Sequence, residues 1–397
     1  MSGQTRTAVH VGREISDEAI EARHHLHEWP ERSHEEYDTT AYLTEFLTLH
    51  GIEVVPTPLK TGVIGVIRGT DDPVNVLLRA DIDGLPVAEH SAYGFHSHRE
   101  GVMHACGHDT HMAALLGAAL YLQRHRDLII GRVTLLFQPA EEYGGAEVVA
   151  KAHLIDDADA LVGFHNDPRT APGTVGISKK PIMADAGIFT VTLHGHGCHA
   201  AYPHKGRSPI EAAATLVGAL QTIVSRNLSP LDSAVVSVTQ IHAGDVYNVI
   251  PSEAMIDGTI REFSPQVLAL IKTRFYELVD HVAKAYGITA SVDRWLFTGA
   301  AVVSDPRFVD AVSGHVNDYA QLIEPEPSFG GEDFSYYLKT KPGLFALIGS
   351  NGDTDAAAWH SPDFVAKDET IPVAIDYFVN SAFDLADWLI RHPHADA

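Results

Sequence analysis

Short apolar runs alternate with helical patterns along the first third of the chain. Apolar residues recur at helical spacing over residues 19–26 and 37–49. Four short apolar runs bounded by polar turns follow, over residues 62–67, 74–78, 133–137 and 160–164. Such runs are typical of the buried strands of a mostly parallel sheet. The helical pattern over 112–125 lies between two of these runs, so we expect a βαβ unit.

A different order of patterns begins near Ala184. The chain there runs strand, helix, strand, strand, helix, strand, over 187–194, 209–226, 234–242, 252–263, 266–286 and 288–296. This βαββαβ order is that of a ferredoxin-like domain. From about Val302 the α/β character returns, and the chain closes with a helix over 371–390. We therefore expect an α/β domain formed by residues 1–183 and 298–397, interrupted by a smaller α+β domain over 184–297.

Composition narrows the choice of partners and compartment. The formal charge of −24 would repel nucleic acid and anionic lipid, so neither is expected as a partner. The longest apolar run, 112–122, is shorter than the roughly 20 residues that a membrane-spanning helix needs. The first residues contain no apolar signal segment. Two cysteines, Cys106 and Cys198, cannot build a disulfide framework, so we expect a cytoplasmic protein.

The segment with the most chemical information is Met103-His-Ala-Cys-Gly-His-Asp-Thr-His111, just before the helical pattern at 112. Cys106 and His108 offer a thiolate and an imidazole two residues apart on a loop, and such a pair can close on one metal ion. The alternative is a buried cysteine beside helix-capping Asp109 and Thr110. The segment alone leaves both interpretations open.

Further candidate groups follow three of the predicted strands. They are Asp81 and Asp83 after 74–78, Glu141 and Glu142 after 133–137, and His165 and Asn166 after 160–164. Each pair alone could be a solvated loop. Open α/β sheets bind ligands at the carboxyl ends of their strands, however, so we expect these groups to meet at one edge.

Adjacent glutamates such as Glu141 and Glu142 have a specific chemical use. One can coordinate a metal while the other accepts a proton from a metal-bound water, whose pKa the metal lowers. The alternative is an acidic loop before Gly144. Other mechanisms lack support, because the chain has no G-x-S-x-G elbow, H-E-x-x-H helix, P-loop or G-x-G-x-x-G motif after a strand. Cys106 as a nucleophile is conceivable, but neighbouring carboxylates favour metal ligation instead.

Five motifs stand in order along the chain: Leu78-Arg-Ala-Asp-Ile-Asp-Gly-Leu-Pro86, His104-Ala-Cys-Gly-His-Asp-Thr-His111, Gln138-Pro-Ala-Glu-Glu142, Gly163-Phe-His-Asn166 and Gly330-Gly-Glu-Asp-Phe334. Together they closely resemble the amidohydrolase branch of the M20 metallopeptidase family. That branch includes N-acyl-amino-acid amidohydrolases, hippurate hydrolases and indole-acetyl-amino-acid hydrolases. The resemblance extends from about Arg23 to the last helix and includes His24-His-Leu-His-Glu-Trp-Pro-Glu31.

The resemblance implies a zinc-exopeptidase-like catalytic domain that holds two divalent ions and a lid domain that makes a homodimer. The implied metal ligands are Cys106, His108, Glu142, His165 and His360. Glu141 matches the general base, and Asp83 matches the acidic residue that orients a ligand histidine. Thiolate and imidazole suit zinc, whereas a carboxylate-rich site also accepts manganese, cobalt or nickel.

The lid motif His196-Gly-Cys-His-Ala-Ala-Tyr-Pro-His204 implies that His199 reaches the substrate carbonyl, in this family often from the partner subunit. Asn248 and Arg261 match positions that hold a substrate carboxylate, for which a guanidinium fork is suited. Two positions depart from the pattern. Cys198 stands where the family usually has Gly, and Ser208-Pro209 replaces Asp-Pro. A thiol beside His199 either alters the choice of acyl group or has no role.

The resemblance therefore implies hydrolysis of the amide bond of N-acyl amino acids of the acetyl, benzoyl or aryl-acetyl type. A dipeptidase or carboxypeptidase of the same family would use the same site. A metal-binding or scaffold protein without activity is the third interpretation, but such a protein has no need of Glu141 beside the ligands.

Overall fold

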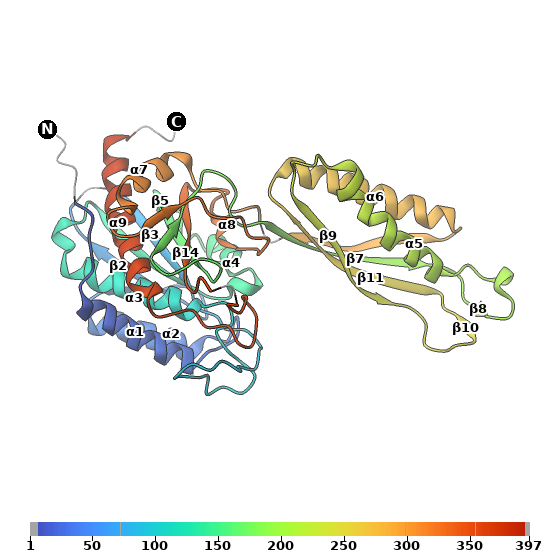
Figure 1. The fold of residues 1–397 in the computed structure, drawn as a ribbon, viewed down its shortest axis with the longest axis horizontal. Helices are drawn as coiled ribbons and strands as arrows, with labels where there is room; N and C mark the ends of the chain where they lie inside the picture. The colour runs from blue at the N-terminus through green and yellow to red at the C-terminus, as the bar shows by residue number, and fades with distance from the viewer. Residues whose placement is uncertain (1–6, 72, 298, 354, 394–397) are drawn as a thin grey trace. The chain divides into compact units, whose positions relative to one another are not determined.

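The computed structural model describes residues 7–71, 73–297, 299–353 and 355–393. The chain divides into two compact units, each described here by itself (Figure 1). The first unit comprises Met1–Ile182, Val303–Glu326 and Asp333–Ala397, and the second comprises Met183–Val302 with Pro327–Glu332. The expected insertion, 184–297, falls within the second unit, to which the short segment 327–332 also belongs.

The first unit is built on an eight-stranded sheet with the order β1-β2-β4-β3-β5-β14-β6-β13. Its strands are β1 (Glu53–Val55), β2 (Val63–Arg68), β3 (Asn75–Asp81), β4 (Arg132–Gln138), β5 (Ala160–Asp167), β6 (Thr174–Gly176), β13 (Gln321–Ile323) and β14 (Gly343–Gly349). The central strands β4, β3, β5 and β14 are parallel to one another. This arrangement was expected for β3, β4 and β5, whereas β14 was not predicted. The strand expected over 62–67 forms as β2, but it pairs antiparallel with both β1 and β4.

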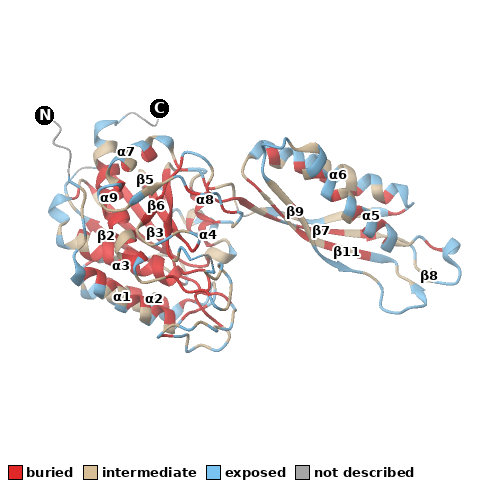
Figure 2. Ribbon diagram, in the orientation of Figure 1, coloured by how far each residue is buried: buried red, intermediate tan, exposed pale blue. Residues whose placement is uncertain are grey.

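Helices cover this sheet and complete its main apolar core. They are α1 (Arg13–Glu28), α2 (Tyr37–Leu49), α3 (His108–Arg124), α4 (Gly145–Lys151), α7 (Pro306–Val316), α8 (Phe334–Tyr337) and α9 (Thr370–Arg391), with 3-10 turns at Arg126–Leu128 and Glu141–Tyr143. Helix α3 packs against α1, α9 and β3, and nearly all of its residues are buried (Figure 2). An apolar, alanine-rich sequence lets α3 bury its whole circumference in this way.

The start of α3 differs from the expectation. The helix was expected from residue 112, but it begins at His108, and Gly107 forms its N-cap at a φ of 87°. No side chain caps the helix, so the capping role that the alternative interpretation gave to Asp109 and Thr110 is wrong. The physical reason is that Gly107 adopts the left-handed conformation that turns the chain into the helix directly after Cys106.

The second unit has the predicted βαββαβ order. Its strands are β7 (Asp185–His194), β9 (Ala234–His242), β11 (Glu253–Glu262) and β12 (Thr289–Phe297), and its helices are α5 (Pro209–Thr222), continued by a π-turn at Ile223–Asn227, and α6 (Pro265–Ala285). The strands form an antiparallel sheet in the order β12-β7-β11-β9. Buried residues alternate along β11, because α5 and α6 cover one face of the sheet (Figure 2).

A small feature of the second unit was not predicted. β8 (Cys198–His199) pairs antiparallel with β10 (Val249–Ile250), and a 3-10 turn at Pro203–Lys205 follows β8. Strands of two residues carry too short a pattern to be recognised from sequence. In the described parts of both units, no helix combines the length and the apolarity required to cross a membrane.

Candidate metal centre

The carboxyl ends of three parallel strands deliver the candidate groups to one edge of the first unit's sheet. Asp83 lies just beyond β3, Glu141 and Glu142 follow β4, and His165 lies near the carboxyl end of β5. Because β3 pairs in parallel with both β4 and β5, the expectation that these groups meet at one edge is confirmed. Five groups of potential metal ligands form among the described residues, and two of them share Cys106: Cys106 with His108 and His165, and Cys106 with Glu142 and His360. The other three are Asp81 with His108 and His111, Glu141 with His108 and Glu142, and Glu141 with Glu332 and Asp333.

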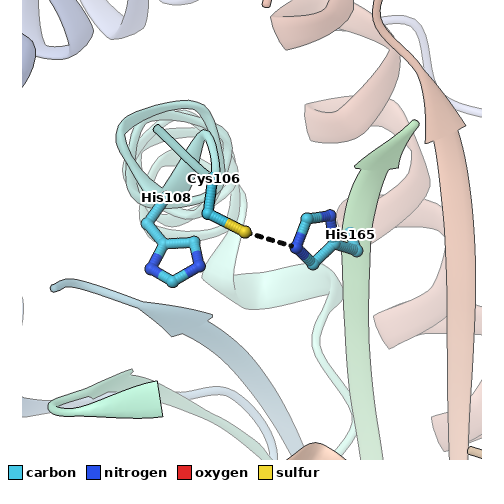
Figure 3. Close-up of side chains that lie close together, drawn as sticks. All are labelled: Cys106, His108 and His165. Carbon is cyan, nitrogen blue, oxygen red and sulfur yellow. Dashed lines mark hydrogen bonds between the residues drawn. The ribbon is translucent and has the colours of Figure 1, made fainter. Parts of the chain in front are cut away.

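The first group is fully buried. The Cys106 Sγ lies 3.3 Å from His165 Nε2, and the ligand atoms of Cys106, His108 and His165 are all within 4.8 Å of one another. Figure 3 shows the thiol at the start of α3 pointing toward the imidazole on β5, with the His108 ring beside it. A thiolate and two imidazole nitrogens at such distances match the donor types that bind zinc and its neighbours in the transition series.

Backbone carbonyls hold both histidines in the orientation that a metal ligand needs. His108 Nδ1 donates to the Asp83 carbonyl at 2.9 Å, and His165 Nδ1 donates to the Asn166 carbonyl at 2.8 Å. A carbonyl can only accept, so each ring carries a proton on Nδ1 and turns its Nε2 toward the group. His108 Nε2 is buried and has no hydrogen-bond partner in the described residues. Such an orphaned buried nitrogen fits a site that binds a cation.

The second group shares its sulfur with the first. His360 Nε2 lies 3.1 Å from Glu142 Oε1, and both ligand atoms are within 4.8 Å of the Cys106 sulfur. His360 adopts a positive φ of 65°, and its N–H donates to the Ala105 carbonyl at 2.8 Å. This backbone hydrogen bond ties a residue far along the chain to the segment that carries Cys106. The donors of this group fit a divalent ion, and a thiolate common to both groups can serve two ions.

Glu141 stands beside these groups on a strained turn. The preceding Ala140 has a φ of 56°, and a 3-10 turn at Glu141–Tyr143 follows it. The Asp83 carboxylate accepts the N–H of Glu141 at 3.1 Å and the N–H of Glu142 at 3.2 Å. Glu141 Oε2 lies 3.9 Å from His108 Nε2. Asp83 therefore touches His108 through its carbonyl and both glutamates through its carboxylate.

Carboxylates dominate the electrostatics of the buried group. Burial opposes charging of His108, but the carboxylates of Asp81 and Asp83 outweigh it and raise its pKa to about 10. His165 behaves in the opposite way, because burial and the neighbouring His111 hold its pKa well below the usual value. The pKa of Asp83 is lowered, since hydrogen bonding and charge from His108 outweigh the cost of burial. The edge of the sheet thus concentrates negative charge where the ligand atoms converge.

A second layer of buried polar groups supports the ligands. The sequence placed Asp81 and Asn166 at this edge of the sheet but indicated no role for His111. His111 Nδ1 donates to Asp81 at 2.6 Å, and the N–H of Asn166 donates to His111 Nε2 at 3.0 Å. The Asn166 side chain donates to the Cys106 carbonyl at 2.7 Å. Asn166 was seen only as the neighbour of His165, and the only signal in the sequence was its place at the end of β5.

Asp109 has a different role from the cap that was considered for it. It accepts from Arg23 Nε at 2.9 Å and from His27 Nδ1 at 3.0 Å, and all three side chains are almost fully buried. Burial lowers the pKa of His27, but Asp109 and Glu89 outweigh it and raise that pKa to about 9. A buried charged cluster therefore fixes α1 against the first turn of α3, directly beside His108.

His199, expected at the substrate carbonyl, and the two expected substrate-binding residues, Asn248 and Arg261, lie in the second unit. Val249 pairs with His199 in the β8–β10 ribbon, and the Asn248 carbonyl accepts the N–H of Ala200 at 2.9 Å, so the structure brings His199 and Asn248 together. It does not bring Arg261 to them, because Arg261 lies at the opposite end of β11 from the ribbon. There Arg261 Nη1 donates to the Ile260 carbonyl at 2.9 Å, and burial lowers its pKa.

An α/β sheet whose parallel strands end at two ligand groups sharing one sulfur is the arrangement of a dinuclear metallohydrolase. The family model for Peptidase family M20/M25/M40 matches residues 77–384, and the chain belongs to this family. The resemblance deduced from the five motifs is thereby confirmed.

Relatives and solved structures agree with this assignment over most of the chain. The chain is 44% identical over 371 residues to the N-acetyl-L-cysteine deacetylase of Bacillus subtilis, covering 92% of this chain and 87% of the relative. It is 36% identical over 365 residues to Thermostable carboxypeptidase 1 of Saccharolobus solfataricus, covering 90% of this chain and 93% of the relative. A solved Bacillus subtilis structure, described as a dinuclear metal binding peptidase from the M20 family, matches with a TM-score of 0.84 and 34% identity, covering 95% of this chain and 99% of that one.

Proposed function

We propose that the protein hydrolyses the amide bond of N-acyl amino acids and that Glu141 is its general base. The observation that carries this proposal is the place of Glu141, beside two ligand groups that share Cys106. The 44% identity to an N-acetyl-L-cysteine deacetylase supports an N-acyl amino acid as the substrate class.

Two divalent ions would be held by the two groups, with Cys106 common to both, His108 and His165 on one side and Glu142 and His360 on the other. When bound, they would polarise the amide carbonyl and make an attacking water more acidic. We propose zinc or manganese, since thiolate and imidazole suit zinc and the carboxylates also suit manganese; cobalt and nickel are further candidates. Elemental analysis of protein purified without added metal tests this proposal, and a metal-free preparation with full activity would overturn it.

The chain's own residues would move one proton through the reaction. Glu141 Oε2, the oxygen near His108 Nε2, would accept a proton from a water molecule while the oxygen of that water bonds to the amide carbon. The same oxygen would return the proton to the amide nitrogen as the carbon–nitrogen bond breaks, which leaves a carboxylic acid and a free amine. The acid then releases its own proton to solvent and becomes a carboxylate. Asp83 would keep Glu141 in place through its backbone N–H.

Residues of the second unit complete the proposed mechanism. We propose that His199 donates to the carbonyl oxygen of the substrate as that oxygen gains charge, from the same chain or from a partner subunit. Asn248 shares the ribbon with His199 and would bind the substrate carboxylate. Arg261 is proposed for the same carboxylate because of its bidentate fork, and it now donates to the carbonyls of Ile260 on its own strand and Gly187 on β7.

Replacing the base without changing its shape tests the proposal directly. Glu141→Gln should lower kcat about 100- to 10,000-fold, because general base catalysis contributes that much, while the metal content is unchanged. Glu147→Gln, in the exposed first turn of α4, is the matched control and should retain normal activity. Near-normal turnover by the metal-loaded Glu141→Gln protein would show that Glu141 is not the base.

A carboxypeptidase is the second candidate, and the 36% identity to a thermostable carboxypeptidase favours it. The two candidates share the chemistry and differ in what lies on the acyl side of the bond. A panel of N-acetyl, N-benzoyl and indole-acetyl amino acids against dipeptides and longer peptides separates them. Higher kcat/KM on peptides than on every N-acyl amino acid would select the carboxypeptidase.

We propose that the protein is a cytoplasmic homodimer that pairs through the second unit. Strand β9 lies at the edge of that unit's sheet, and its second half is exposed, including Ile241 at 52%. Edge strands offer unpaired backbone groups to a second chain. Cys106 and Cys198 are not in a disulfide, which is compatible with a reducing compartment. Sedimentation of the protein before and after Ile241→Lys tests the dimer, and cell fractionation tests the compartment.

A further inference from the structure

A cluster of fully buried polar side chains contacts Glu141 through the backbone of Asp333. Its members are Arg79 on β3, Gln138 at the end of β4, and Asp333 and Tyr337 around α8. Arg79 donates to Asp333 Oδ1 at 2.9 Å and to Gln138 Oε1 at 2.9 Å. Gln138 Nε2 donates to both oxygens of Asp333 at 2.9 Å, and the Tyr337 hydroxyl donates to Gln138 Oε1 at 2.8 Å. These contacts fix the Asp333 carboxylate from several directions.

The backbone of Asp333 in turn contacts the proposed base. Its N–H lies 3.3 Å from Glu141 Oε1 and donates to it. The other oxygen, Glu141 Oε2, lies 3.9 Å from His108 Nε2. One oxygen of Glu141 is thus engaged on the side of the buried cluster, and the other faces the ligand groups.

The cluster also fixes the segment that follows Glu141. Asp333 Oδ2 accepts the N–H of Ala146, in the first turn of α4, at 2.7 Å. The turn that carries Glu141 is therefore held at both ends, by Asp83 through the N–H of Glu141 and by Asp333 through the N–H of Ala146. A side chain anchored in this way loses little entropy when it acts.

We propose that Asp333, held by Arg79 and Gln138, is a positioning residue that orients Glu141 so that Oε2 carries the proton. This inference rests on the proposed function, since it needs Glu141 to be the general base. Burial of an ion pair is weak support for a purely stabilising role, because well-packed apolar residues often serve stability as well. Arg79 also donates to Asp81 at 2.7 Å. An experiment must therefore separate a change in the orientation of Glu141 from a change in metal binding.

A double-mutant cycle with Glu141 makes that separation. Asp333→Asn keeps the shape of the side chain. Arg79, Gln138 and the N–H of Ala146 all donate to the Asp333 carboxylate, so the new amide group would bring its own N–H against at least one of these donors. In the otherwise unchanged protein, loaded with its metals and assayed on an N-acetyl amino acid, kcat should fall about 10- to 100-fold while KM changes less than about 3-fold. In the Glu141→Gln background the same substitution should change kcat less than about 2-fold, because it acts only through Glu141.

A milder substitution and a control keep the test decisive if Asp333→Asn folds poorly. Tyr337→Phe deletes one hydroxyl contact to Gln138 and should lower kcat about 3-fold, again only when Glu141 is present. Asp376→Asn replaces a buried aspartate of α9 that accepts the N–H of Val11, and it should leave kcat unchanged.

The outcomes are distinct. Equal losses of kcat in the presence and absence of Glu141, loss of bound metal from Asp333→Asn, or unchanged kcat in both Asp333→Asn and Tyr337→Phe would overturn the positioning role. Near-normal turnover by Glu141→Gln alone would instead overturn the proposed function. A kcat loss confined to chains that contain Glu141, with metal content and KM preserved, supports the positioning role.

Discussion

The proton of each buried ligand histidine is assigned by a backbone carbonyl before any metal arrives. Asp83 and Asn166 supply those carbonyls, and each lies at the end of a parallel strand. The cost of orienting His108 and His165 is therefore met during folding, which is why a rigid sheet edge is an effective place for such ligands. Cys106 differs, because its sulfur belongs to both groups.

This shared position leads to a prediction for Cys106. Cys106→Ala should weaken the binding of both ions by more than the roughly 10- to 100-fold that supporting residues contribute, because it removes a donor from each group. His165→Ala removes a donor from one group only and should weaken one ion. The ratio of metal to protein after dialysis against buffered metal measures both effects.

Cys198→Ala is the matched control for the Cys106 prediction. Cys198 lies in the second unit and is in none of the ligand groups found in the described residues, so its metal content should be normal. A Cys106→Ala protein that still bound two ions tightly would contradict the shared position of the sulfur.

At the scale of single residues, the sequence predicted part of the centre by reasoning and part only by resemblance. Cys106, His108 and the two glutamates were found from spacing and strand order alone. His360 lies in a loop without periodic pattern, so only the family motif pointed to it, and the Ala105 carbonyl that holds it is a long-range contact. Asp333 stood in a quoted motif without a role, because its partner Arg79 is 254 positions away in the sequence.

The first turn of α3 is the element on which the centre depends most. Gly107 adopts a φ of 87°, and a Cβ placed on it would lie 2.4 Å from the Asn166 side-chain nitrogen, which donates to the Cys106 carbonyl. Gly107→Ala should therefore lower the free energy of unfolding by roughly 2–4 kcal/mol, from backbone strain together with the displaced amide, and should weaken metal binding. Urea unfolding and metal titration measure the two effects.

Gly101→Ala separates the backbone term from the clash. Gly101 has a φ of 71°, and a Cβ there would have no heavy atom within 4 Å. This substitution should cost only the strain of a positive φ, roughly 1–2 kcal/mol, and should leave metal binding unchanged. Equal costs at the two positions would show that the Asn166 contact does not constrain Gly107.

Elements with a strong periodic pattern were predicted well, and their ends were predicted less well. Helix α2 has the expected bounds, Tyr37–Leu49, because its apolar stripe is flanked by polar residues. Helix α3 begins four residues before the expected residue 112, because a glycine in the left-handed conformation starts it and no capping side chain marks the position. The apolar run of β2 predicted a buried strand of a parallel sheet, but the strand pairs antiparallel. Burial on both faces does not reveal the direction of pairing.

At the scale of the whole chain, each unit has its own apolar core. The core of the first unit joins residues from α1, α3, α9 and the central strands, whereas the core of the second joins α5, α6 and its antiparallel sheet. The change from βαβ patterns to βαββαβ near Ala184 predicted this division. The return of segment 327–332 to the second unit could not be predicted, because nothing in its composition distinguishes it from the loops around it.

Separate cores predict that metal removal affects the two units unequally. Both ligand groups that contain Cys106 lie in the first unit, so ions bound there stabilise that unit only. At a free metal concentration of about 100 times the Kd, the stabilisation is roughly 2.7 kcal/mol per site and about 5.4 kcal/mol for both ions, which corresponds to about 10–20 °C in Tm for a unit of this size. Calorimetry with and without a chelator should show one transition that moves down by this amount and a second that stays in place.

The Cys106→Ala protein should show the lower transition without any chelator. Equal shifts of both transitions would mean that the units unfold as one, and no shift at all would mean that no ion binds the centre.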